Sequence, residues 1–159
     1  MTDNHERTLV LLKPDAVQRG LIGEILSRFE RKGLKIVGLK MIELDDALLA
    51  THYAHIVGRP FYPRLVEFMQ STPVVGICLE GLDCVRVVRD QLVGNITNSR
   101  NDAAGTIRGD YGMSTQSNII HASESVNAAQ EEVPRFFDDD DLFRYDRILD
   151  ACLYAPDER

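Results

Sequence analysis

The chain has 159 residues, of which 44% are hydrophobic and 27% are charged, a composition that is ordinary for a soluble globular protein with one domain over residues 1–159. The formal net charge of −7 argues against a nucleic-acid-binding surface, which needs a basic face. No apolar run approaches the roughly 20 residues that span a bilayer, and the polar N-terminus lacks a signal-peptide segment. We therefore expect a cytoplasmic protein with neither a nucleic-acid surface nor a membrane partner.

The cysteines and the acidic residues bear on whether the chain has disulfides, a zinc site or an acidic surface. Cys78, Cys84 and Cys152 are odd in number and form no Cys-x-x-Cys pair, so they indicate neither a disulfide framework nor a zinc site. The acidic run at residues 138–141 is typical of a solvated surface that keeps a protein soluble. Adaptation to a salty cytoplasm is the alternative, and the sequence leaves both open.

Three segments at the start of the chain have clear patterns. Residues 8–12 form an apolar run ahead of Pro14, which predicts a buried strand that the proline ends. Apolar residues recur at helical spacing over residues 22–29, and Gly33 is suited to end this helix. Residues 34–44 show partial alternation, which predicts a second strand.

The following segments contain helix starts and another apolar run. Asp45 or Asp46 can cap a helix that runs through Tyr53. Pro60 opens a second helical stretch. Residues 74–79 then predict a third buried strand.

The second half of the chain begins with a helix that follows Asp83 and ends at Gly94. Between residues 95 and 116 the periodic pattern fails, which predicts a loop of about 20 residues, and loops of this length are usually functional or disordered. Residues 118–121 predict the fourth strand, and a closing helix follows over residues 126–136.

This order of strands and helices indicates a βαββαβ layout. We predict an α+β, ferredoxin-like fold, in which a four-stranded antiparallel sheet is covered by helices. The helices are expected to lie on one face of the sheet.

The segment from Asn118 to Ser125 carries the most chemical information. It consists of an apolar run, a histidine at the point where the predicted strand ends, and small hydroxyl-bearing residues that resemble a helix start. A histidine at a strand end can act as a nucleophile or a proton carrier at neutral pH. A histidine with no catalytic role is the alternative, and the segment alone does not decide.

Phosphate binding would have to rely on side-chain charge, because the chain has no glycine-rich phosphate loop. The candidates are Lys13, Arg89, Thr106 and Arg108. Arginine presents a planar fork that suits phosphate oxygens, and lysine supplies a point charge. Each of these residues, taken alone, is also typical of a solvated surface.

Four motifs, taken together, point to a known family. They are Lys13-Pro14-Asp15, Arg59-Pro60-Phe61-Tyr62-Pro63, Gly105-Thr106-Ile107-Arg108-Gly109-Asp110-Tyr111 and Asn118-Ile119-Ile120-His121-Ala122-Ser123. With these motifs in this order and at these spacings, the chain resembles the nucleoside diphosphate kinase family from Glu6 to about Tyr154. The rival readings, an inactive relative and a regulatory ligand-binding domain of the same layout, would not need the full set of charged residues.

The resemblance implies a phosphotransferase. Members of the family move the γ-phosphate of a nucleoside triphosphate, mainly ATP, onto a nucleoside diphosphate in a ping-pong reaction through a phosphohistidine. His121 matches the family's nucleophile, and Glu132 matches the carboxylate that orients it. Ser123 matches a hydroxyl that supports this contact.

The resemblance also implies how the nucleotide binds. Arg89, Thr97 and Arg108 match the family's phosphate ligands, and Tyr53 lies close to them in the family pattern. The remaining matches are Lys13 and Asn118 for the sugar hydroxyls, Phe61 for stacking on the base, and Thr115 for the position opposite Phe61, which is usually apolar in the family. Stacking tolerates any base, so broad base and sugar specificity is expected.

The same resemblance implies a Mg²⁺ cofactor and assembly into a homo-oligomer. Mg²⁺ should be held by substrate phosphates and water, with no metal ligand from the protein. The expected partners are nucleoside di- and triphosphates and further copies of the chain, in a hexamer or a tetramer.

The chain departs from the family pattern in two regions. Between Arg89 and Gly105 it is about two residues longer than the family's usual spacing, so Thr97 and Asn95 compete for one phosphate contact. Ala104 stands where the family commonly has proline, which restores unfolded-state freedom worth about 0.4–1 kcal/mol.

The other departures flank the predicted catalytic residues. Ala122 replaces a common glycine, a change that is harmless unless the backbone has a positive φ. Pro134 falls inside the closing helix, where it removes a backbone donor and can kink the chain just past Glu132.

Overall fold

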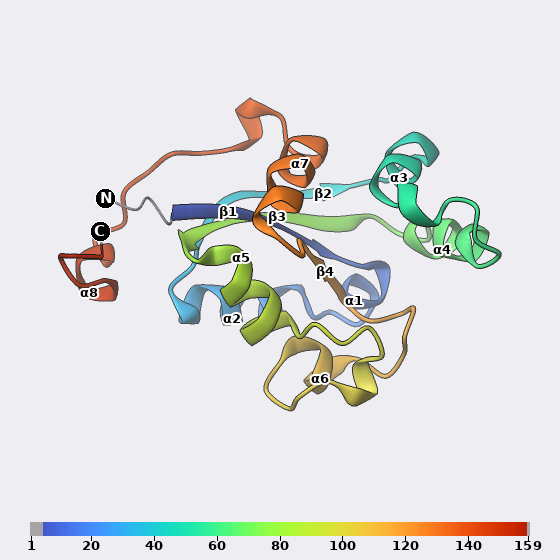
Figure 1. Cartoon of the computed structure of the whole chain (residues 1–159), viewed down its shortest axis with the longest axis horizontal. Helices are drawn as coiled ribbons and strands as arrows, with labels where there is room; N and C mark the ends of the chain where they lie inside the picture. The colour runs from blue at the N-terminus through green and yellow to red at the C-terminus, as the bar shows by residue number, and fades with distance from the viewer. Residues whose placement is uncertain (1–4, 159) are drawn as a thin grey trace.

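The computed structural model describes residues 5–158 and is built on one antiparallel sheet (Figure 1). The sheet has four strands, and their order is β2-β3-β1-β4. Every neighbouring pair in it is antiparallel, which confirms the predicted α+β, ferredoxin-like architecture. The strands are β1 (His5–Leu12), β2 (Lys35–Ile42), β3 (Val74–Leu82) and β4 (Ile120–Ala122).

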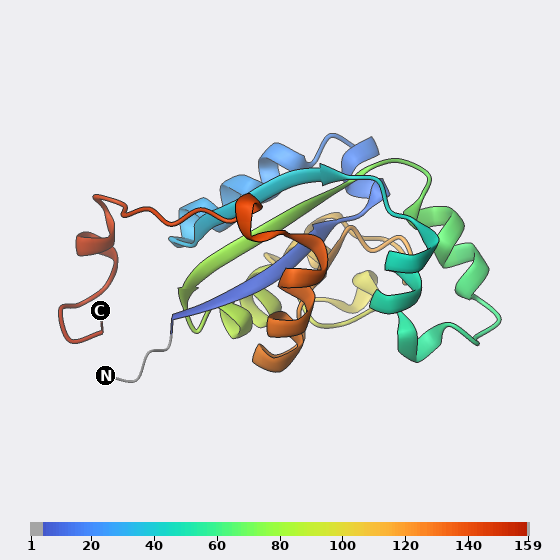
Figure 2. The ribbon, with the colours of Figure 1, turned by 90° about the horizontal axis from the view of Figure 1, so that it is seen from above.

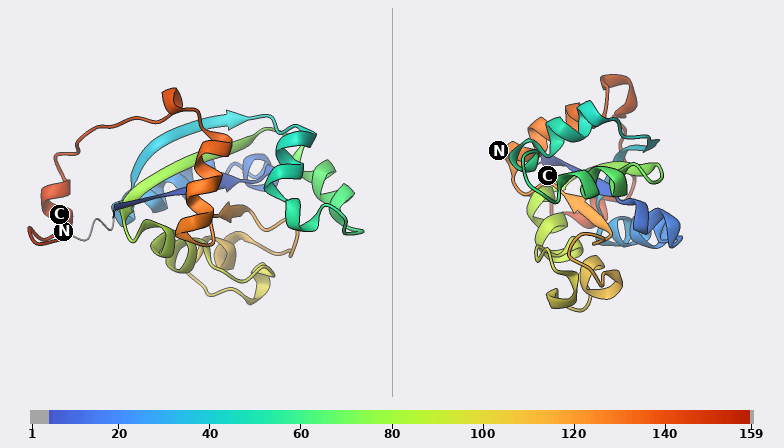
Figure 3. Two further views of the ribbon diagram at one scale, coloured as in Figure 1. Left: turned by 45° about the horizontal axis from the view of Figure 1, so that its top comes forward. Right: turned by 90° about the vertical axis from the view of Figure 1, so that its right-hand side faces the viewer.

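Helices cover both faces of this sheet, so the prediction of helices on one face was wrong. Figures 1 and 3 show α3 and α7 on one side and α2 and α5 on the other. The helices are α1 (Pro14–Gln18), α2 (Ile22–Lys32), α3 (Asp46–His52), α4 (Tyr62–Met69), α5 (Cys84–Arg86), α6 (Ile107–Tyr111), α7 (Val126–Phe136) and α8 (Asp150–Leu153), and the shorter turns are η1 (Ala54–Ile56), η3 (Ser99–Asn101) and η4 (Asp139–Asp141).

The apolar run of β1 explains why both faces are covered. Side chains alternate between the faces of a strand. Val10 and Leu12 therefore pack in one core with Phe29 of α2, whereas Leu9 and Leu11 pack in the other core, which includes residues of α3, α4 and α7. These four β1 residues are all 0% exposed. A continuous apolar run, without polar alternation, is typical of a strand that is buried on both faces.

The fourth strand begins at Ile120, two residues later than predicted, because the backbone turns sharply at Ile119. Ile119 has a φ of 73°, and the N–H of Ile120 donates to the carbonyl of Asn118 at 2.8 Å. A positive φ is strained for a β-branched residue. The strain is held by the Asp15 carboxylate, which accepts from the N–H of Ile119 at 2.9 Å, and by the N–H of Lys13, which donates to the Ile119 carbonyl at 2.9 Å.

The predicted loop of residues 95–116 contains regular structure, which corrects that prediction. It holds η3 and the five-residue helix α6, and Thr106 caps α6 by accepting from the N–H of Gly109 at 3.0 Å. Ile107 anchors α6 in the core at 0% exposure. A helix this short gives no periodic signal, which is also why α1 was not predicted.

The predicted helix after Asp83 changes type along its length. After α5 it continues as the π-helix η2 (Val87–Val93), in which the N–H of Gly94 donates to the carbonyl of Arg89, five residues earlier, at 3.1 Å. Such wide turns are rare and are frequent at functional sites. A π-helical turn takes up an extra residue, so η2 accommodates part of the longer spacing after Arg89.

The two departures beside the predicted catalytic residues cause little disturbance. Ala122 pairs with Val10 in the sheet, and it is not among the positive-φ residues of the described chain. Pro134 lies in the last turn of α7, and the helix continues to Phe136.

The C-terminal segment lies along the outer edge of β2. The N–H of Phe143 donates to the carbonyl of Val37 at 2.8 Å, and the Arg147 guanidinium donates to the carbonyl of Gly33 at 2.7 Å. Figure 2 shows this segment running to α8 at the end of the molecule where β1 begins. Within the described chain, no helix has the length and apolar character that crossing a membrane requires.

Gly23 in α2 and Gly33, which caps the end of that helix, provide a matched stability test. Gly33 ends the helix with a φ of 99°, and a side chain there would also meet Leu153. We expect Gly33→Ala to lower the free energy of unfolding by about 1–2 kcal/mol. Gly23 is exposed with open space around it, so Gly23→Ala should raise the free energy by about 0.5–1 kcal/mol. Urea denaturation of both variants measures the difference, and shifts of the same sign would contradict the αL assignment.

Candidate active site

One cavity of about 600 Å³ gathers most of the predicted site residues. Its walls come from the end of β1, the end of α3, η2, β4 and α7. Eight of the predicted site residues line it: Lys13, Tyr53, Arg89, Thr97, Arg108, Asn118, His121 and Glu132. These residues come from separate segments and span more than a hundred positions of the sequence, yet they line one cavity.

At the floor of this cavity, His121 is held by a carboxylate. Its Nε2 lies 3.0 Å from Oε2 of Glu132, which reaches across from α7. The Ser123 hydroxyl donates to the same oxygen at 2.6 Å, and Ser123 itself is 0% exposed. The N–H of Ser123 donates to the carbonyl of Leu9 at 3.1 Å, which anchors this hydroxyl to the central strand. The sheet thus fixes the carboxylate through Ser123, and the carboxylate fixes the imidazole.

The protonation states of this pair follow from the geometry and the burial. Burial lowers the pKa of His121, although Glu132 acts in the opposite direction, so the imidazole is neutral at pH 7. Burial alone would raise the pKa of Glu132, but the hydrogen bonds from His121 and Ser123 lower it, so this carboxyl group is ionised. An ionised carboxylate only accepts hydrogen bonds. The proton of His121 must therefore sit on Nε2, and Nδ1 carries a free lone pair.

Lys13 and Asn118 form a second fixed pair in the cavity. Nζ of Lys13 donates to Oδ1 of Asn118 at 2.6 Å. The amide nitrogen of Asn118 donates to the carbonyls of Thr97 at 3.2 Å and Thr115 at 3.0 Å. Burial, followed by the charge of Arg108, lowers the pKa of Lys13 to about 8, whereas Asp15 acts in the opposite direction.

Two arginines flank His121 by binding the backbone of its own strand. The Arg89 guanidinium donates to the carbonyl of Ala122 at 3.0 Å, and that of Arg108 donates to the carbonyl of Ile120 at 2.8 Å. Arg108 also donates to the carbonyl of Gly94 at 3.2 Å, at the end of η2. Burial, followed by the charge of Arg89, lowers the pKa of Arg108 to about 10.

These cations lack acidic partners. Among residues 5–158, no ion pair includes Lys13, Arg89 or Arg108. Nε of Arg108 is also buried without a hydrogen-bond partner. Buried charge is costly unless it is paired. Three cations that converge on one cavity therefore define a site for a multiply charged anion.

The geometry distinguishes the two candidates in the longer segment. Thr97 lines the cavity, and its carbonyl accepts from Asn118. The side chain of Asn95 instead donates to Asp90 at 2.9 Å, and Asn95 is not a lining residue. The structure therefore favours Thr97 as the polar group beside the arginines.

Phe61 does not line this cavity, in contrast to the other predicted nucleotide ligands. It stands at the start of α4 and is 49% exposed. Thr115 is also exposed, and it contributes only its carbonyl to Asn118. Ser123 lies behind Glu132 rather than at the cavity surface.

Sequence reasoning missed His52 and Arg135, which line the cavity beside His121. The ring centroids of His52 and His121 are 4.7 Å apart. His52 occupies the last turn of a predicted helix and belongs to none of the four motifs. Its only signal was its position next to Tyr53.

Within the described residues, one group of side chains could bind a metal ion. It consists of His52, His121 and Glu132, whose ligand atoms lie within 4.8 Å of one another. Two imidazoles and one carboxylate do not suit Mg²⁺, which prefers oxygen ligands and retains water. Glu132 is also already bonded to His121 and Ser123. The protein residues therefore fit Mg²⁺ only as an ion that arrives with the phosphates of a substrate.

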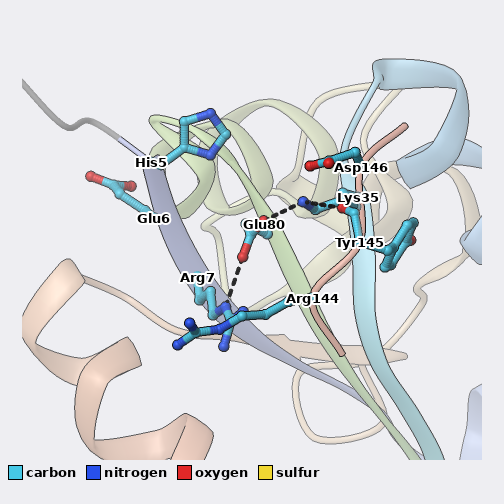
Figure 4. A pocket seen from close by; sticks show the side chains of 8 residues that line it. All are labelled: His5, Glu6, Arg7, Lys35, Glu80, Arg144, Tyr145 and Asp146. Carbon is cyan, nitrogen blue, oxygen red and sulfur yellow. Dashed lines mark hydrogen bonds and ion pairs between the residues drawn. The ribbon is translucent and has the colours of Figure 1, made fainter. Parts of the chain in front are cut away.

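A second cavity, of about 420 Å³, lies at the other end of β1 and contrasts with this site (Figure 4). Two of its basic residues, Arg7 and Lys35, share one carboxylate. Glu80 accepts from Arg7 at 2.9 Å and from Lys35 at 2.6 Å (Figure 4). Beside His121, by contrast, Lys13 and Arg108 are buried and have no acidic partner among the described residues.

Comparisons with known proteins agree with this geometry. A family model described as nucleoside diphosphate kinase matches residues 6–142. A nucleoside diphosphate kinase of Parabacteroides distasonis is 52% identical over 153 residues, covering 96% of this chain and 99% of its own length. One from Rhodopirellula baltica has the same identity and coverage. A solved structure of a halophilic nucleoside diphosphate kinase from Halobacterium salinarum in complex with CDP is 46% identical, with a TM-score of 0.89, and the match covers 94% of this chain and 99% of that one.

The fold and the anion-binding cavity define a nucleotide-binding phosphotransferase. The chain belongs to the nucleoside diphosphate kinase family and is an enzyme of that family.

The lowered pKa of Lys13 can be measured directly. The chain has four lysines. We expect the Lys13 resonance to titrate near pH 8 in NMR spectra of lysine-labelled protein, so that the cavity loses one positive charge as the pH rises through this value. This resonance should be absent from Lys13→Arg. Phosphate in the cavity should raise the pKa, because an anion stabilises the ammonium form. If no lysine titrated near pH 8, the burial assigned to Lys13 would be wrong.

Proposed function

We propose that this enzyme transfers the γ-phosphate of a nucleoside triphosphate, mainly ATP, to a nucleoside diphosphate through a phosphohistidine at His121. The observation that carries the proposal is the position of the His121 imidazole, bonded to a carboxylate in a cavity that cations line. Its Nε2–H is held by Glu132, while Arg89, Arg108 and Lys13 surround it without acidic partners. A neutral, oriented imidazole beside unpaired cations suits nucleophilic attack on a phosphoryl group.

In the first half-reaction, the lone pair on Nδ1 of His121 attacks the γ-phosphorus. The new N–P bond forms as the bond to the β,γ-bridging oxygen breaks, and the nucleoside diphosphate leaves with that electron pair. The imidazole ring becomes positively charged because Nε2 keeps its proton. Glu132 accepts from Nε2–H and stabilises that charge.

In the second half-reaction, a terminal oxygen of another nucleoside diphosphate attacks the same phosphorus. The N–P bond breaks, and its electron pair returns to Nδ1, which regenerates neutral His121. One site thus serves both nucleotides in turn, which is a ping-pong mechanism.

The phosphate ligands act by charge and position. Arg89, Arg108 and Thr97 would bind the phosphate oxygens, with the hydroxyl of Tyr53 beside them. Mg²⁺, which would be held by the substrate phosphates rather than by these side chains, would supply neutralisation of the charge that develops on the phosphate oxygens. The buried guanidinium of Arg108 is fixed by two backbone carbonyls, so it needs little reorganisation during the transfer.

The sugar and the base would bind toward the rim of the cavity. Lys13 and Asn118, already bonded to each other, present polar groups for the sugar hydroxyls. Phe61 offers an exposed ring for stacking, which recognises no base edge. Broad base and sugar specificity follows, and the related halobacterial enzyme in complex with CDP is consistent with a pyrimidine nucleotide in this site.

Assembly into a homo-oligomer, a hexamer or a tetramer, is also proposed. Leu39 and Met41 on the outer strand β2 are 50% and 60% exposed. Phe143 and Ile148, in the C-terminal segment beside β2, are 63% and 96% exposed. Apolar side chains along an open sheet edge are typical of a protein interface. A single domain over residues 1–159 and a cytoplasmic location complete the proposal.

The phosphoenzyme can be tested by radiolabelling. Protein incubated with γ-labelled ATP and Mg²⁺ should carry label that is lost in acid and stable in alkali, as expected for a phosphoramidate. His121→Ala should carry none, because the label is proposed to reside on the imidazole of His121. Addition of GDP should discharge the label into GTP.

Two results would contradict this mechanism. Equal labelling of wild type and His121→Ala would place the phosphate elsewhere. A labelled wild-type protein that failed to discharge into GDP would indicate a dead-end phosphorylation.

The proposed interface can be tested by molar mass. Light scattering after gel filtration should show that the wild type is an oligomer. Leu39→Glu combined with Met41→Glu should at least halve its mass, because paired copies would bury like charges. Val57→Glu is a matched control, since Val57 is 43% exposed but lies outside β2 and the C-terminal segment. A monomeric wild type would exclude the interface.

A further inference from the structure

His52 is packed among three rings beneath the proposed nucleophile. It is the last residue of α3 and is 8% exposed. Its ring meets that of His121 at a centroid distance of 4.7 Å and an angle of 84°. The rings of Tyr53 and Phe136 also meet it edge-on, at 4.8 Å and 5.0 Å. Four rings from three elements thus support one another, and one of them belongs to His121.

The tautomer of His52 is set by Arg135. An arginine side-chain nitrogen lies 3.3 Å from Nδ1 of His52, and a guanidinium can only donate. Nδ1 of His52 therefore accepts, and its proton sits on Nε2. Nε2 is buried without a hydrogen-bond partner. An unpaired buried donor usually costs about 1–3 kcal/mol, so its retention calls for an explanation.

The charges around His52 keep its ring neutral. Burial lowers the pKa of His52, and a positive charge on His121 would lower it further. The charges of Arg135 and Lys13 act in the same direction, whereas Glu132 acts in the opposite direction. The His121 ring becomes positively charged during the proposed phosphoryl transfer. A neutral His52 ring adds no like charge beside it.

The hydrogen bond to Glu132 does not by itself fix the orientation of the His121 ring. That bond fixes one ring atom, Nε2, and determines which nitrogen carries the proton. It does not prevent the imidazole from rocking about the Nε2 contact, which would swing Nδ1 out of line with the phosphate. The nearly perpendicular ring of His52 occupies the space that such a motion needs.

We propose that His52 is a positioning residue for phosphoryl transfer, and that its ring fixes the plane of the His121 ring so that Nδ1 faces the phosphate-binding cavity. The proposal rests on the function proposed above. Arg135 supports this role by holding the His52 ring through Nδ1. The ring, rather than the unpaired N–H, provides the effect, so an aromatic ring without nitrogen should largely replace it.

The test compares His52→Ala, His52→Phe and the control His5→Ala, since His5 is an exposed histidine at the start of β1, outside this cavity. His52→Ala should slow single-turnover labelling by γ-labelled ATP about 10–100-fold, because small misplacements of reacting atoms have large effects on rate. The Kd for ADP should stay within about threefold, because the charged phosphate ligands are unchanged. His52→Phe should label within about threefold of wild type, as should His5→Ala.

Ring motion provides a readout that does not depend on phosphorylation. The chain has four histidines, so ¹³C relaxation of labelled histidine can be assigned to His121. The order parameter of its Cε1–H bond should fall in His52→Ala and be retained in His52→Phe. Thermal unfolding of both variants shows whether they are folded, and His52→Phe supports the comparison if the alanine variant is not.

The outcomes separate this inference from the proposed function. Wild-type labelling rates and order parameters in His52→Ala would overturn the role of His52 and leave the phosphohistidine intact. Equal slowing in the alanine and phenylalanine variants, with an ordered His121 ring, would show that Nε2–H itself acts on the phosphoryl group, and would overturn positioning by the ring. A wild type that takes no label would refute the proposed function, and the order parameters would still decide whether His52 holds the ring of His121.

Discussion

The arrangement of the site depends on the hydrogen bond between His121 and Glu132. The carboxylate comes from α7 and the imidazole from β4, so the bond joins the helix to the edge strand of the sheet. Ser123 completes it by donating to the same oxygen, while its own backbone is bonded to β1. Because Glu132 is ionised, Nε2 must carry the proton, and the nucleophilic lone pair is left on Nδ1. Oε2 of Glu132 thus joins α7 to β4, sets the tautomer of His121 and leaves Nδ1 free for the proposed reaction.

The rest of the cavity shows how the fold holds positive charge while no anion is bound. Arg89 and Arg108 donate to backbone carbonyls of β4, and Lys13 donates to the side-chain oxygen of Asn118. Neutral acceptors of this kind hold the cations in place without cancelling their charge. The strained turn at Ile119 places Asn118 beside Lys13 and starts β4 just before His121. Backbone strain, unpaired charge and the buried donor of His52 therefore occur around one cavity, as is common where structure is adapted to function.

The sequence predicted the four strands and the main helices, because apolar periodicity and proline or glycine boundaries are local signals. It did not predict that both faces of the sheet are covered, although the unbroken apolar run of β1 carried that information. The helix α6 was too short for periodicity to reveal, and the π-helical turn η2 has no sequence signature. The family resemblance that the ordered motifs indicate predicted eight residues of the cavity, of which four lie in the motifs themselves. The exposed position of Phe61 and the ring contacts of His52 depend on tertiary packing that no local pattern encodes.

The most direct test of this account is the identity of the phosphorylated nitrogen of His121. Wild-type protein labelled with ¹⁵N-histidine can be phosphorylated by ATP and Mg²⁺, denatured in alkali and examined by ³¹P–¹⁵N correlation NMR. We expect phosphate on Nδ1 of His121 alone, because Glu132 holds the proton on Nε2. Phosphate on Nε2 would show that Glu132 does not hold the imidazole in this tautomer during the reaction, and would contradict the central claim.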